Sequence, residues 1–303
     1  MVFKSPYFSV VIPLYNKGRY VAATLASVLQ QTFTDFEVIV VDDGSTDNGL
    51  EVVRSCPDPR VSVVVQENMG VSAARNHGIR RAKSDYIAFL DADDLWEPTY
   101  LGEMKQLMDS YPGAGFYVSA HKIVKKSRVF DLPYTLAEGA IENYFKTELE
   151  ESITRLSATV VPRAICEQVG GFPQGMVSGE DSYFCGSIAI RHPVVFTPKV
   201  LAVYNQQYSG IKDRHFRGDS CSEKWFDLVE AGDFYRNEFI ASKVIKAGIR
   251  SALSLQKEKS REIEAKSSFT TLFRKKWNYL YFLNRMPSST INLYKEIKPY
   301  LSF

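Results

Sequence analysis

Short apolar runs alternate with helical patterns along the first hundred residues of the chain. Runs of β-branched and aromatic residues, bounded by polar or turn residues, predict buried strands at 8–14, 36–41, 61–65 and 86–90. Between them, residues 20–31, 46–55 and 72–82 have helical length, with Ala, Leu or Val at helical spacing. Because strands alternate with helices, we expect an α/β protein with a Rossmann-like, mostly parallel sheet flanked by helices.

The pattern is less regular after residue 98. A helix is expected from Pro98 to about residue 111, because proline is tolerated in the first helical turn, and a strand is expected over 116–119. Residues 121–151 fit no clear pattern. Short helices are expected over 163–169 and 181–191, the first of them ended by Gly170 and Gly171.

The last part of the chain is helical in pattern and basic. Residues 239–303 hold 13 Lys and Arg against 4 Asp and Glu, a balance of +9, which leaves −7 for the first 238 residues. We therefore expect one domain over residues 1–220 and a basic helical region over 221–303. That region could lie on an anionic membrane, pack on the first domain or bind a second subunit, and apolar stripes at helical spacing favour packing. The residues expected on its apolar face are Phe269, Leu272, Phe273, Lys276, Leu280 and Leu283.

Cysteine usage and hydropathy indicate the compartment. The four cysteines show no C-x-x-C pair, which favours free thiols in a reducing compartment. No signal-type segment is seen, and no apolar run approaches the ~18 residues that would span a bilayer. We expect a cytoplasmic protein, possibly held at the inner face of the cell membrane.

Acidic residues gather where the fourth predicted strand ends. Asp91, Asp93 and Asp94 follow the strand at 86–90. Because like charges at one place raise each other's pKa, such a cluster predicts a divalent cation, Mn²⁺ or Mg²⁺, with positions left open for the oxygens of a diphosphate. The alternative, weighed more heavily for Asp94 than for Asp93, is a helix cap or turn former before Pro98.

A second acidic pair ends the second predicted strand. An Asp at this place, Asp42 or Asp43, could accept the imide N–H of a uracil ring. Ser45 and Thr46, which follow, are expected to cap the next helix.

Five segments, in this order, resemble glycosyltransferase family 2, a family of inverting enzymes with the A-type glycosyltransferase fold. The resemblance implies that residues 1–220 form a nucleotide-sugar-binding and catalytic domain with a helical C-terminal extension. The segments are VVIPLYN at 10–16, SVLQQT at 27–32, VDDGSTD at 41–47, NMGVSAARNHG at 68–78 and LDADD at 90–94.

The same resemblance implies roles for individual residues. Arg75 would approach the nucleotide or the acidic loop, the segment 91–94 that contains Asp91, Asp93 and Asp94. The alternative is a structural partner for Asp91 or Asp43, because buried carboxylates are usually paired. Among the others, Pro13 and Tyr15 would shape the nucleotide pocket, Asp43 would read the pyrimidine base, Asp91 would contact ribose or sugar, and Asp93 would hold the metal at the diphosphate.

The family places a catalytic base at a downstream acidic pair, for which Asp181 is the candidate, with Glu180 in support. A carboxylate there could take the proton of the acceptor hydroxyl; the alternative is an Asp that only interacts favourably with a helix N-terminus. Residues 204–217 could close over the diphosphate. Within them, His215 is either a metal or phosphate ligand or a plain surface histidine.

Together these features predict transfer of a single sugar from a nucleoside diphosphate sugar, in particular a UDP-sugar, to an acceptor hydroxyl with inversion. The acceptor would be a carbohydrate or lipid-linked sugar, as in polysaccharide, lipopolysaccharide or glycolipid assembly. The Q-x-x-R-W sequence of processive synthases is absent. The alternatives are a sugar nucleotidyltransferase, disfavoured because no phosphate-binding glycine loop is present, and a non-catalytic nucleotide-sugar-binding protein. No nucleic-acid partner is expected, and homo-oligomers remain open.

Overall fold

A computed structural model describes residues 5–125, 128–176, 178–206 and 222–297. Two compact units are present. The N-terminal unit comprises Met1–Gln174 and Glu180–Ser209, and the C-terminal unit comprises Gly175–Gly179 and Gly210–Phe303.

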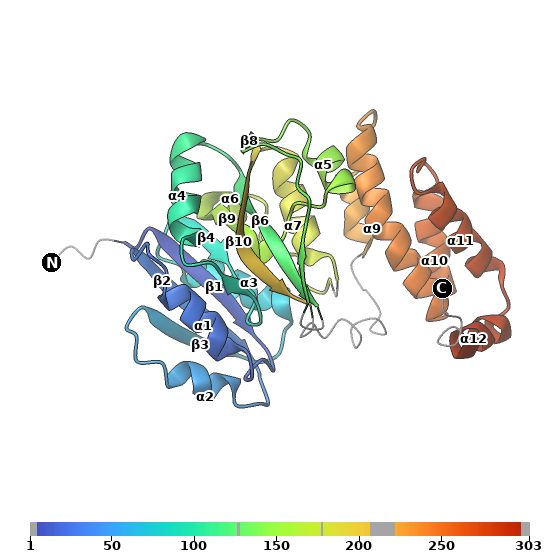
Figure 1. The fold of residues 1–303 in the computed structure, drawn as a ribbon. Helices are drawn as coiled ribbons and strands as arrows, with labels where there is room; N and C mark the ends of the chain where they lie inside the picture. The colour runs from blue at the N-terminus through green and yellow to red at the C-terminus, as the bar shows by residue number, and fades with distance from the viewer. Residues whose placement is uncertain (1–4, 126–127, 177, 207–221, 298–303) are drawn as a thin grey trace. The chain divides into compact units, whose positions relative to one another are not determined.

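The N-terminal unit is built on one mixed sheet, whose strands run in the order β3-β2-β1-β4-β9-β6-β10-β5 (Figure 1). Strand β7 pairs with β6, and β8 pairs with β10. The strands are β1 (Phe8–Leu14), β2 (Phe36–Asp43), β3 (Val61–Gln66), β4 (Tyr86–Phe89), β5 (Leu95–Trp96), β6 (Phe116–Lys125), β7 (Arg128–Asp131), β8 (Gly139–Ala140), β9 (Thr159–Pro162) and β10 (Val194–Asn205).

The fold class predicted from the sequence is confirmed. Strands β1, β2, β3 and β4 are parallel, as are β6 and β10, while β9 lies antiparallel between β4 and β6. The first four predicted strands are present, and the strand expected over 116–119 extends to Lys125. Strands β9 and β10 were not predicted, because β9 has four residues and β10 is interrupted by exposed positions and register shifts between Thr197 and Ala202.

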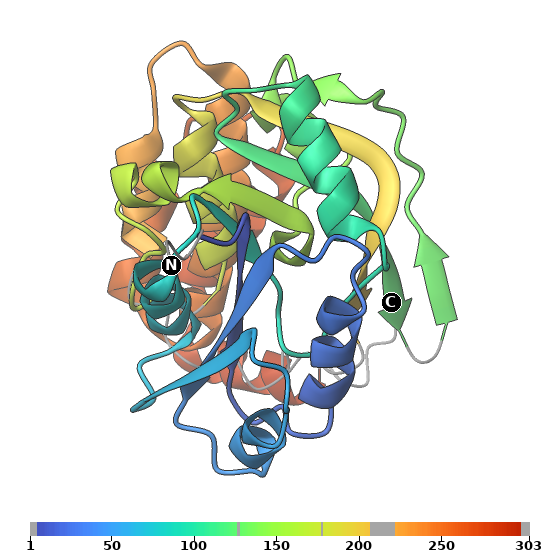
Figure 2. The same ribbon diagram turned by 90° about the vertical axis from the view of Figure 1, so that its left-hand side faces the viewer.

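Helices cover both sides of this sheet. Figure 2 shows α1 and α4 on one side and α3 on the other. Helix α3 packs closely on β1: a Cβ at Gly78 would lie 2.3 Å from Cγ1 of Val11, so this position requires glycine. The helices of this unit are α1 (Val21–Leu29), α2 (Gly49–Arg54), α3 (Val71–Arg81), α4 (Tyr100–Ser110), α5 (Tyr144–Glu150), α6 (Arg163–Gln168) and α7 (Glu180–Ala189), with a 3₁₀ helix, η1, at Leu156–Ala158.

Asp94 joins the end of β4 to two distant segments. Its carboxylate is buried, accepting a hydrogen bond from the Ser157 hydroxyl at 2.5 Å and one from the Asn205 backbone N–H at 2.9 Å. Its own N–H donates to the Asp91 carbonyl, closing a turn. A cap role for Asp94 is therefore wrong, because α4 begins at Tyr100, directly after Thr99.

Burial is also the main influence on this carboxylate's proton affinity. It raises the pKa of Asp94 well above the usual range, and the charges of Asp91 and Asp93 raise it further. The hydrogen bonds from Ser157 and Asn205 act in the opposite direction. Asp94 is thus a structural carboxyl whose ionisation burial opposes.

The C-terminal unit is helical. Leu280 and Leu283 are buried in it, and Gly248 lets α9 approach both Ile263 and Leu280. Among the described residues, no helix has the length and apolar character to cross a bilayer. Its helices are η2 (Ser222–Leu228), α9 (Phe234–Leu253), α10 (Lys257–Lys266), α11 (Arg274–Arg285) and α12 (Ser288–Ile297).

The apolar face expected over residues 269–283 is only partly correct. Helix α11 begins at Arg274, so Phe269 and Leu272 precede it, and both are exposed. Leu280 and Leu283 alone of the expected leucines face the core. The pattern could not show that the helix starts five residues after Phe269.

Asp94→Asn tests the structural role of this carboxyl. The amide keeps the shape, can accept from the Asn205 N–H and can donate to Ser157, and it removes a like charge beside Asp91 and Asp93. We expect D94N to match or exceed wild-type stability at pH 8, whereas D94A loses about 2 kcal/mol because it leaves two buried donors unpaired. Urea unfolding in EDTA measures both.

The pH dependence of the same variant has a definite sign. Since the folded-state pKa of Asp94 lies above its unfolded value of about 4, the stability that the protonated group contributes is complete below about pH 4. It is lost as the pH rises through the folded-state pKa. The advantage of D94N should therefore grow with pH, and an advantage that shrinks would contradict this assignment.

Candidate active site

The acidic loop follows β4, at the sheet edge where the parallel strands β1, β2 and β4 end. The Asp93 side chain is 12% exposed and forms an ion pair with the Lys17 ammonium, from the loop after β1. Burial raises the pKa of Asp93, while the Lys17 charge opposes the rise. A cation at this carboxylate is therefore electrostatically favoured, and Lys17 supplies one in this structure.

The donor set fits a divalent ion that is shared with a substrate. Among the residues that the structure describes, no three His, Cys, Asp or Glu side chains gather as a complete metal cage. Mg²⁺ and similar ions are, however, often held by one or two carboxylates together with substrate phosphates. Asp93 and Asp91, two residues apart after β4, match that arrangement.

Arg75 links this loop to α7. Its guanidinium is buried, with Nη2 2.7 Å from Asp91 Oδ1 and Nη1 3.2 Å from Glu180 Oε1. Burial alone would lower the pKa of Arg75, but Asp91, Glu180 and Asp181 raise it above the usual range. Arg75 was expected either to approach the acidic loop or to be a structural partner of Asp91 or Asp43. It contacts the loop through an ion pair with Asp91, so both descriptions apply to this contact.

A neighbouring anchor orients the arginine. Asn76 donates to the Phe172 carbonyl at 2.8 Å and accepts from the Phe172 N–H at 2.7 Å. The Phe172 ring then lies 5.2 Å from the Arg75 guanidinium carbon and stacks on Phe184 of α7 at 4.0 Å. Gly171 is required here, because a Cβ would lie 2.5 Å from Asn76 Oδ1.

Asp181 is the second residue of α7. Its Oδ1 accepts the Ser182 N–H at 2.6 Å, and its charge acts on Arg75. The side chain is partly exposed, whereas the adjacent Glu180 is buried in the ion pair. The structure thus connects the expected base to the acidic loop through Glu180 and Arg75, over about 90 residues of sequence.

Asp43 is held by three donors in the loop that follows β3. Oδ1 accepts from Gln66 Nε2 at 2.7 Å and from the Met69 N–H at 2.9 Å, and Oδ2 accepts from the Gly70 N–H at 2.8 Å. Gln66 in turn lies 2.8 Å from Nδ1 of His77. Because an ionised carboxylate offers about four acceptor positions, one remains for a further N–H donor.

The predicted capping by Ser45 and Thr46 is wrong. Helix α2 begins at Gly49 after Asn48 and has no side-chain cap. Instead, the Asn16 N–H donates to Ser45 Oγ at 3.1 Å, and the Thr46 N–H donates to Asn16 Oδ1 at 2.7 Å. These bonds fasten the loop after β1 to the loop after β2. Asn16 has a left-handed backbone, with φ of 51°.

Tyr15 and Pro13 lie on the β1 side of the site. Pro13 is in β1, level with Val41 of β2, and Tyr15 follows the strand with 46% of its surface exposed. Lys17 was missed by sequence reasoning, although it directly follows the YN pair that was singled out. The structure places these residues beside Asp43 in the strand order. His215 and most of the proposed closing loop lie outside the described residues.

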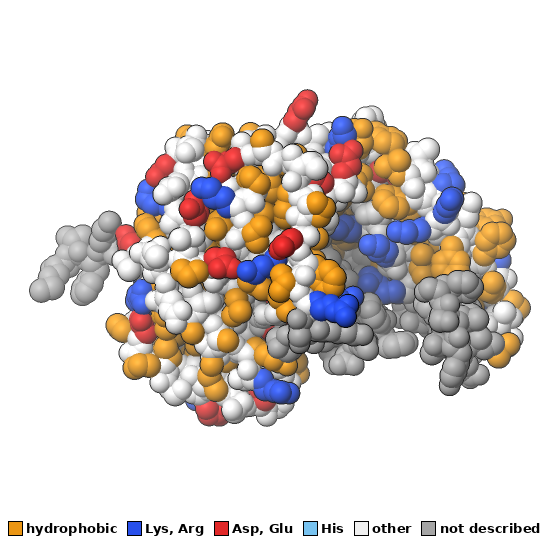
Figure 3. All heavy atoms as spheres, in the orientation of Figure 1, with side chains coloured by type: hydrophobic (Ala, Val, Ile, Leu, Met, Phe, Trp, Pro, Cys, Tyr) orange, Lys and Arg blue, Asp and Glu red, His pale blue; other side chains and the backbone are white. Residues whose placement is uncertain are grey.

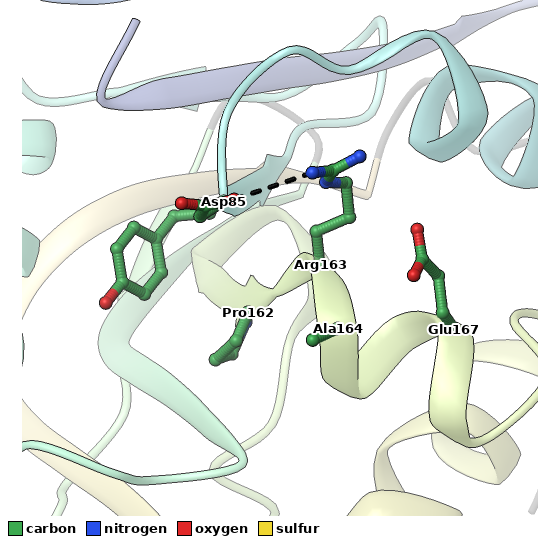
Figure 4. A pocket seen from close by; sticks show the side chains of 6 residues that line it. Asp85, Pro162, Arg163, Ala164 and Glu167 are labelled. Atoms are coloured by element: carbon green, nitrogen blue, oxygen red, sulfur yellow. Dashed lines mark hydrogen bonds and ion pairs between the residues drawn. The ribbon is translucent and has the colours of Figure 1, made fainter. Parts of the chain in front are cut away.

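A pocket at the other edge of the sheet is separate from this site. It lies at the start of β4 and contains an ion pair between Arg163 and Asp85 (Figure 4). Because the acidic loop follows the opposite end of β4, this pocket holds none of the candidate residues. It is lined by Asp85, Tyr86, Pro162, Arg163, Ala164 and Glu167.

Relatives by sequence are glycosyltransferases. An uncharacterised glycosyltransferase of Rickettsia conorii is 31% identical over 202 residues, which are 66% of this chain and 33% of that protein. Glycosyltransferase GlyA of Streptococcus pneumoniae is 37% identical over 245 residues, 74% of this chain and 35% of that protein. The chain therefore matches about a third of the length of these curated relatives.

Solved structures agree in fold. Staphylococcus aureus TarS 1–349 in complex with UDP-GlcNAc has a TM-score of 0.62 at 19% identity, covering 90% of this chain and 79% of that one. The mannosyltransferase PcManGT of Pyrobaculum calidifontis, in complex with GDP-Man and Mn²⁺, has a TM-score of 0.54 at 18% identity, covering 98% and 84%. Both likenesses support the A-type glycosyltransferase fold.

The family model described as glycosyl transferase family 2 matches residues 9–167, more than half of the chain. This match includes β1 to β4, the acidic loop and Arg75. The chain belongs to glycosyl transferase family 2.

Proposed function

We propose that the chain transfers one sugar from a nucleoside diphosphate sugar, in particular a UDP-sugar, to an acceptor hydroxyl with inversion. The observation that carries the proposal is the buried Arg75, which joins Asp91 of the acidic loop to Glu180, the neighbour of Asp181. A donor-binding loop and a candidate base are thereby held in one assembly. A non-catalytic binding protein would not need this connection.

The donor would bind at the ends of β1, β2 and β4. Tyr15 is exposed for stacking against a base, and Asp43 retains an acceptor position for an imide N–H such as that of uracil. Asp91 would contact the ribose or the sugar, and Asp93 would hold a Mn²⁺ or Mg²⁺ ion at the diphosphate. When bound, that ion supplies positive charge where the leaving diphosphate gains negative charge.

Asp181 would act as the general base. Its carboxylate takes the proton of the acceptor hydroxyl while the hydroxyl oxygen forms a bond to the anomeric carbon. The bond from that carbon to the diphosphate oxygen breaks on the opposite face, so the configuration inverts. Arg75 would keep Asp91 and α7 in position throughout, because both of its ion pairs are buried.

The C-terminal unit would bring the enzyme to an anionic membrane surface, which suits a lipid-linked acceptor. Basic side chains gather on this unit (Figure 3), and α11 contains Arg274, Lys275, Lys276 and Arg285 with no acidic residue. Burial and the charges of Lys243, Lys276 and Arg250 lower the pKa of Lys246, as expected in a cluster of like charges. Aromatic residues on the same helix are exposed, namely Tyr279, Tyr281 and Phe282.

Asp93→Ala tests the donor site. Isothermal titration of UDP with Mn²⁺ should show binding to wild-type protein and roughly tenfold or weaker binding to D93A, because a carboxylate that holds the ion is lost. Asp85→Asn is the matched control, since Asp85 is exposed at the other end of β4. Equal UDP affinity in D93A and wild type, with or without Mn²⁺, would remove Asp93 from the donor site.

Asp181→Asn tests the base. UDP release from a panel of UDP-sugars should fall roughly 10²–10⁴-fold, while UDP affinity changes less than about twofold. Unchanged turnover in D181N would eliminate Asp181 as the base, and a product of retained configuration would eliminate the single displacement. Consumption of a nucleoside triphosphate with pyrophosphate release would instead identify a nucleotidyltransferase.

Lys275→Glu tests the membrane contact. Co-sedimentation with phosphatidylcholine vesicles should require added phosphatidylserine, and K275E should weaken it by about 1–2 kcal/mol, because each basic residue near an anionic surface contributes about 1 kcal/mol. Lys83→Glu, an equal charge change on the N-terminal unit, is the control. Equal vesicle binding by K275E and wild type would count against the membrane role. So would a wild-type dimer, measured by light scattering, that the K275E substitution dissociates.

A further inference from the structure

Arg155 has no counter-charge among the residues that the structure describes. Its guanidinium carbon lies 4.1 Å from the ring centroid of Tyr204, in β10. Among the described residues, no carboxylate pairs with this guanidinium, and its buried Nε has no hydrogen-bond partner. Arg75 shares the unpartnered Nε but differs in charge, because its buried guanidinium pairs with two carboxylates.

Arg155 lies next to the acidic loop. It directly precedes η1, in which the Ser157 hydroxyl contacts both Asp94 Oδ2, at 2.5 Å, and the Asp91 N–H, at 3.2 Å. Tyr204 directly precedes Asn205, whose side-chain amide donates to the Asp93 carbonyl at 2.8 Å. Both members of the stacked pair therefore adjoin residues that hold the acidic loop in place.

Two more polar side chains, His121 and Tyr134, lie within range of the Arg155 charge. His121 of β6 is 1% exposed; its Nδ1 lies 3.0 Å from the Tyr134 hydroxyl, and its Nε2 is buried without a partner. Burial, with the nearby Arg155 charge, lowers the pKa of His121 to about 3, so the ring is neutral. Burial raises the pKa of Tyr134 to about 12; the Arg155 charge opposes this rise, and the Glu148 and Glu151 charges add to it. The cluster thus offers a fixed positive charge and unsatisfied hydrogen-bonding atoms.

This cluster is on the side of β4 away from the expected nucleotide pocket. In the strand order, β1 and β2, with Tyr15 and Asp43, lie on one side of β4, and β6 and β10 lie on the other. A planar guanidinium binds two phosphate oxygens at once, and an uncompensated, partly buried charge favours an anionic ligand.

We propose that Arg155, stacked on Tyr204, binds a phosphate-type anionic group of the acceptor. The assignment to the acceptor rests on the proposed function, in which the donor occupies the β1–β2 side of β4. The acceptor class that follows is a phosphorylated sugar or a sugar chain that carries phosphate beside the reacting hydroxyl.

The test separates this site from the donor's diphosphate. Binding of inorganic phosphate is followed by ³¹P line broadening in metal-free buffer, for wild type, Arg155→Met and Arg155→Lys. We expect roughly tenfold weaker binding in R155M and an intermediate value for R155K, which keeps the charge but not the planar fork. Arg163→Met removes an arginine at the far edge of the sheet and should leave phosphate binding unchanged.

A second titration identifies the source of the phosphate. UDP with Mg²⁺ should bind R155M within about twofold of wild type. A loss of UDP affinity in R155M would assign the guanidinium to the donor diphosphate and overturn the acceptor role, and equal phosphate binding by R155M and wild type would overturn the site itself. If wild-type protein binds no UDP, the proposed donor fails, while the phosphate titration still decides on Arg155.

Tyr204→Leu provides an independent variant in case R155M does not fold, as judged by thermal melting. It leaves the guanidinium but removes the ring that orients it. Phosphate binding should weaken by roughly threefold in Y204L, because the guanidinium is no longer held in one orientation by the ring. Unchanged phosphate binding in a folded Y204L would contradict the stacked site.

Discussion

The ion pairs of Arg75 are the interaction on which the site depends. A guanidinium with this little exposure cannot remain without partners, since a buried charge left unpaired costs about 3–5 kcal/mol. Asp91, within the residues that match the family model, and Glu180, beyond them, meet that requirement. The requirement therefore fixes the distance between the acidic loop and α7, and with it the position of Asp181 relative to the loop.

The other carboxylates of the site are stabilised in different ways, and the differences separate structural from functional groups. Asp94 is enclosed by a hydroxyl and a backbone N–H, and burial raises its pKa. Asp43 is held by three donors that leave one acceptor position. Among the described residues, Asp93 has the Lys17 ammonium as its counter-charge. The positions of these three carboxylates in the sequence do not distinguish their roles. The residues that contact each carboxylate do.

Local hydrogen bonds hold the loops that carry these groups. Asn16 joins the loops after β1 and β2, and Asn76 fastens the backbone of Phe172 beside Arg75. Both asparagines lie within segments that resembled the family, yet nothing in the linear pattern shows what they contact. The linear pattern also suggested that Ser45 and Thr46 cap the next helix, because hydroxyl side chains are common at helix starts. In the structure both residues form hydrogen bonds with Asn16 instead.

The sequence by itself determined the parallel half of the sheet, the helices between its strands and the acidic residues at its edge, because apolar periodicity and strand-end polarity are local properties. It did not determine β9 or β10, whose short or interrupted runs are stabilised by neighbouring strands. Only the tertiary structure decided that Arg75 pairs with Asp91 and Glu180, that Lys17 faces Asp93, and that Arg155 stacks on Tyr204. These pairings join residues distant in the chain, and the need to neutralise charge away from water selects them only once the fold has brought them together.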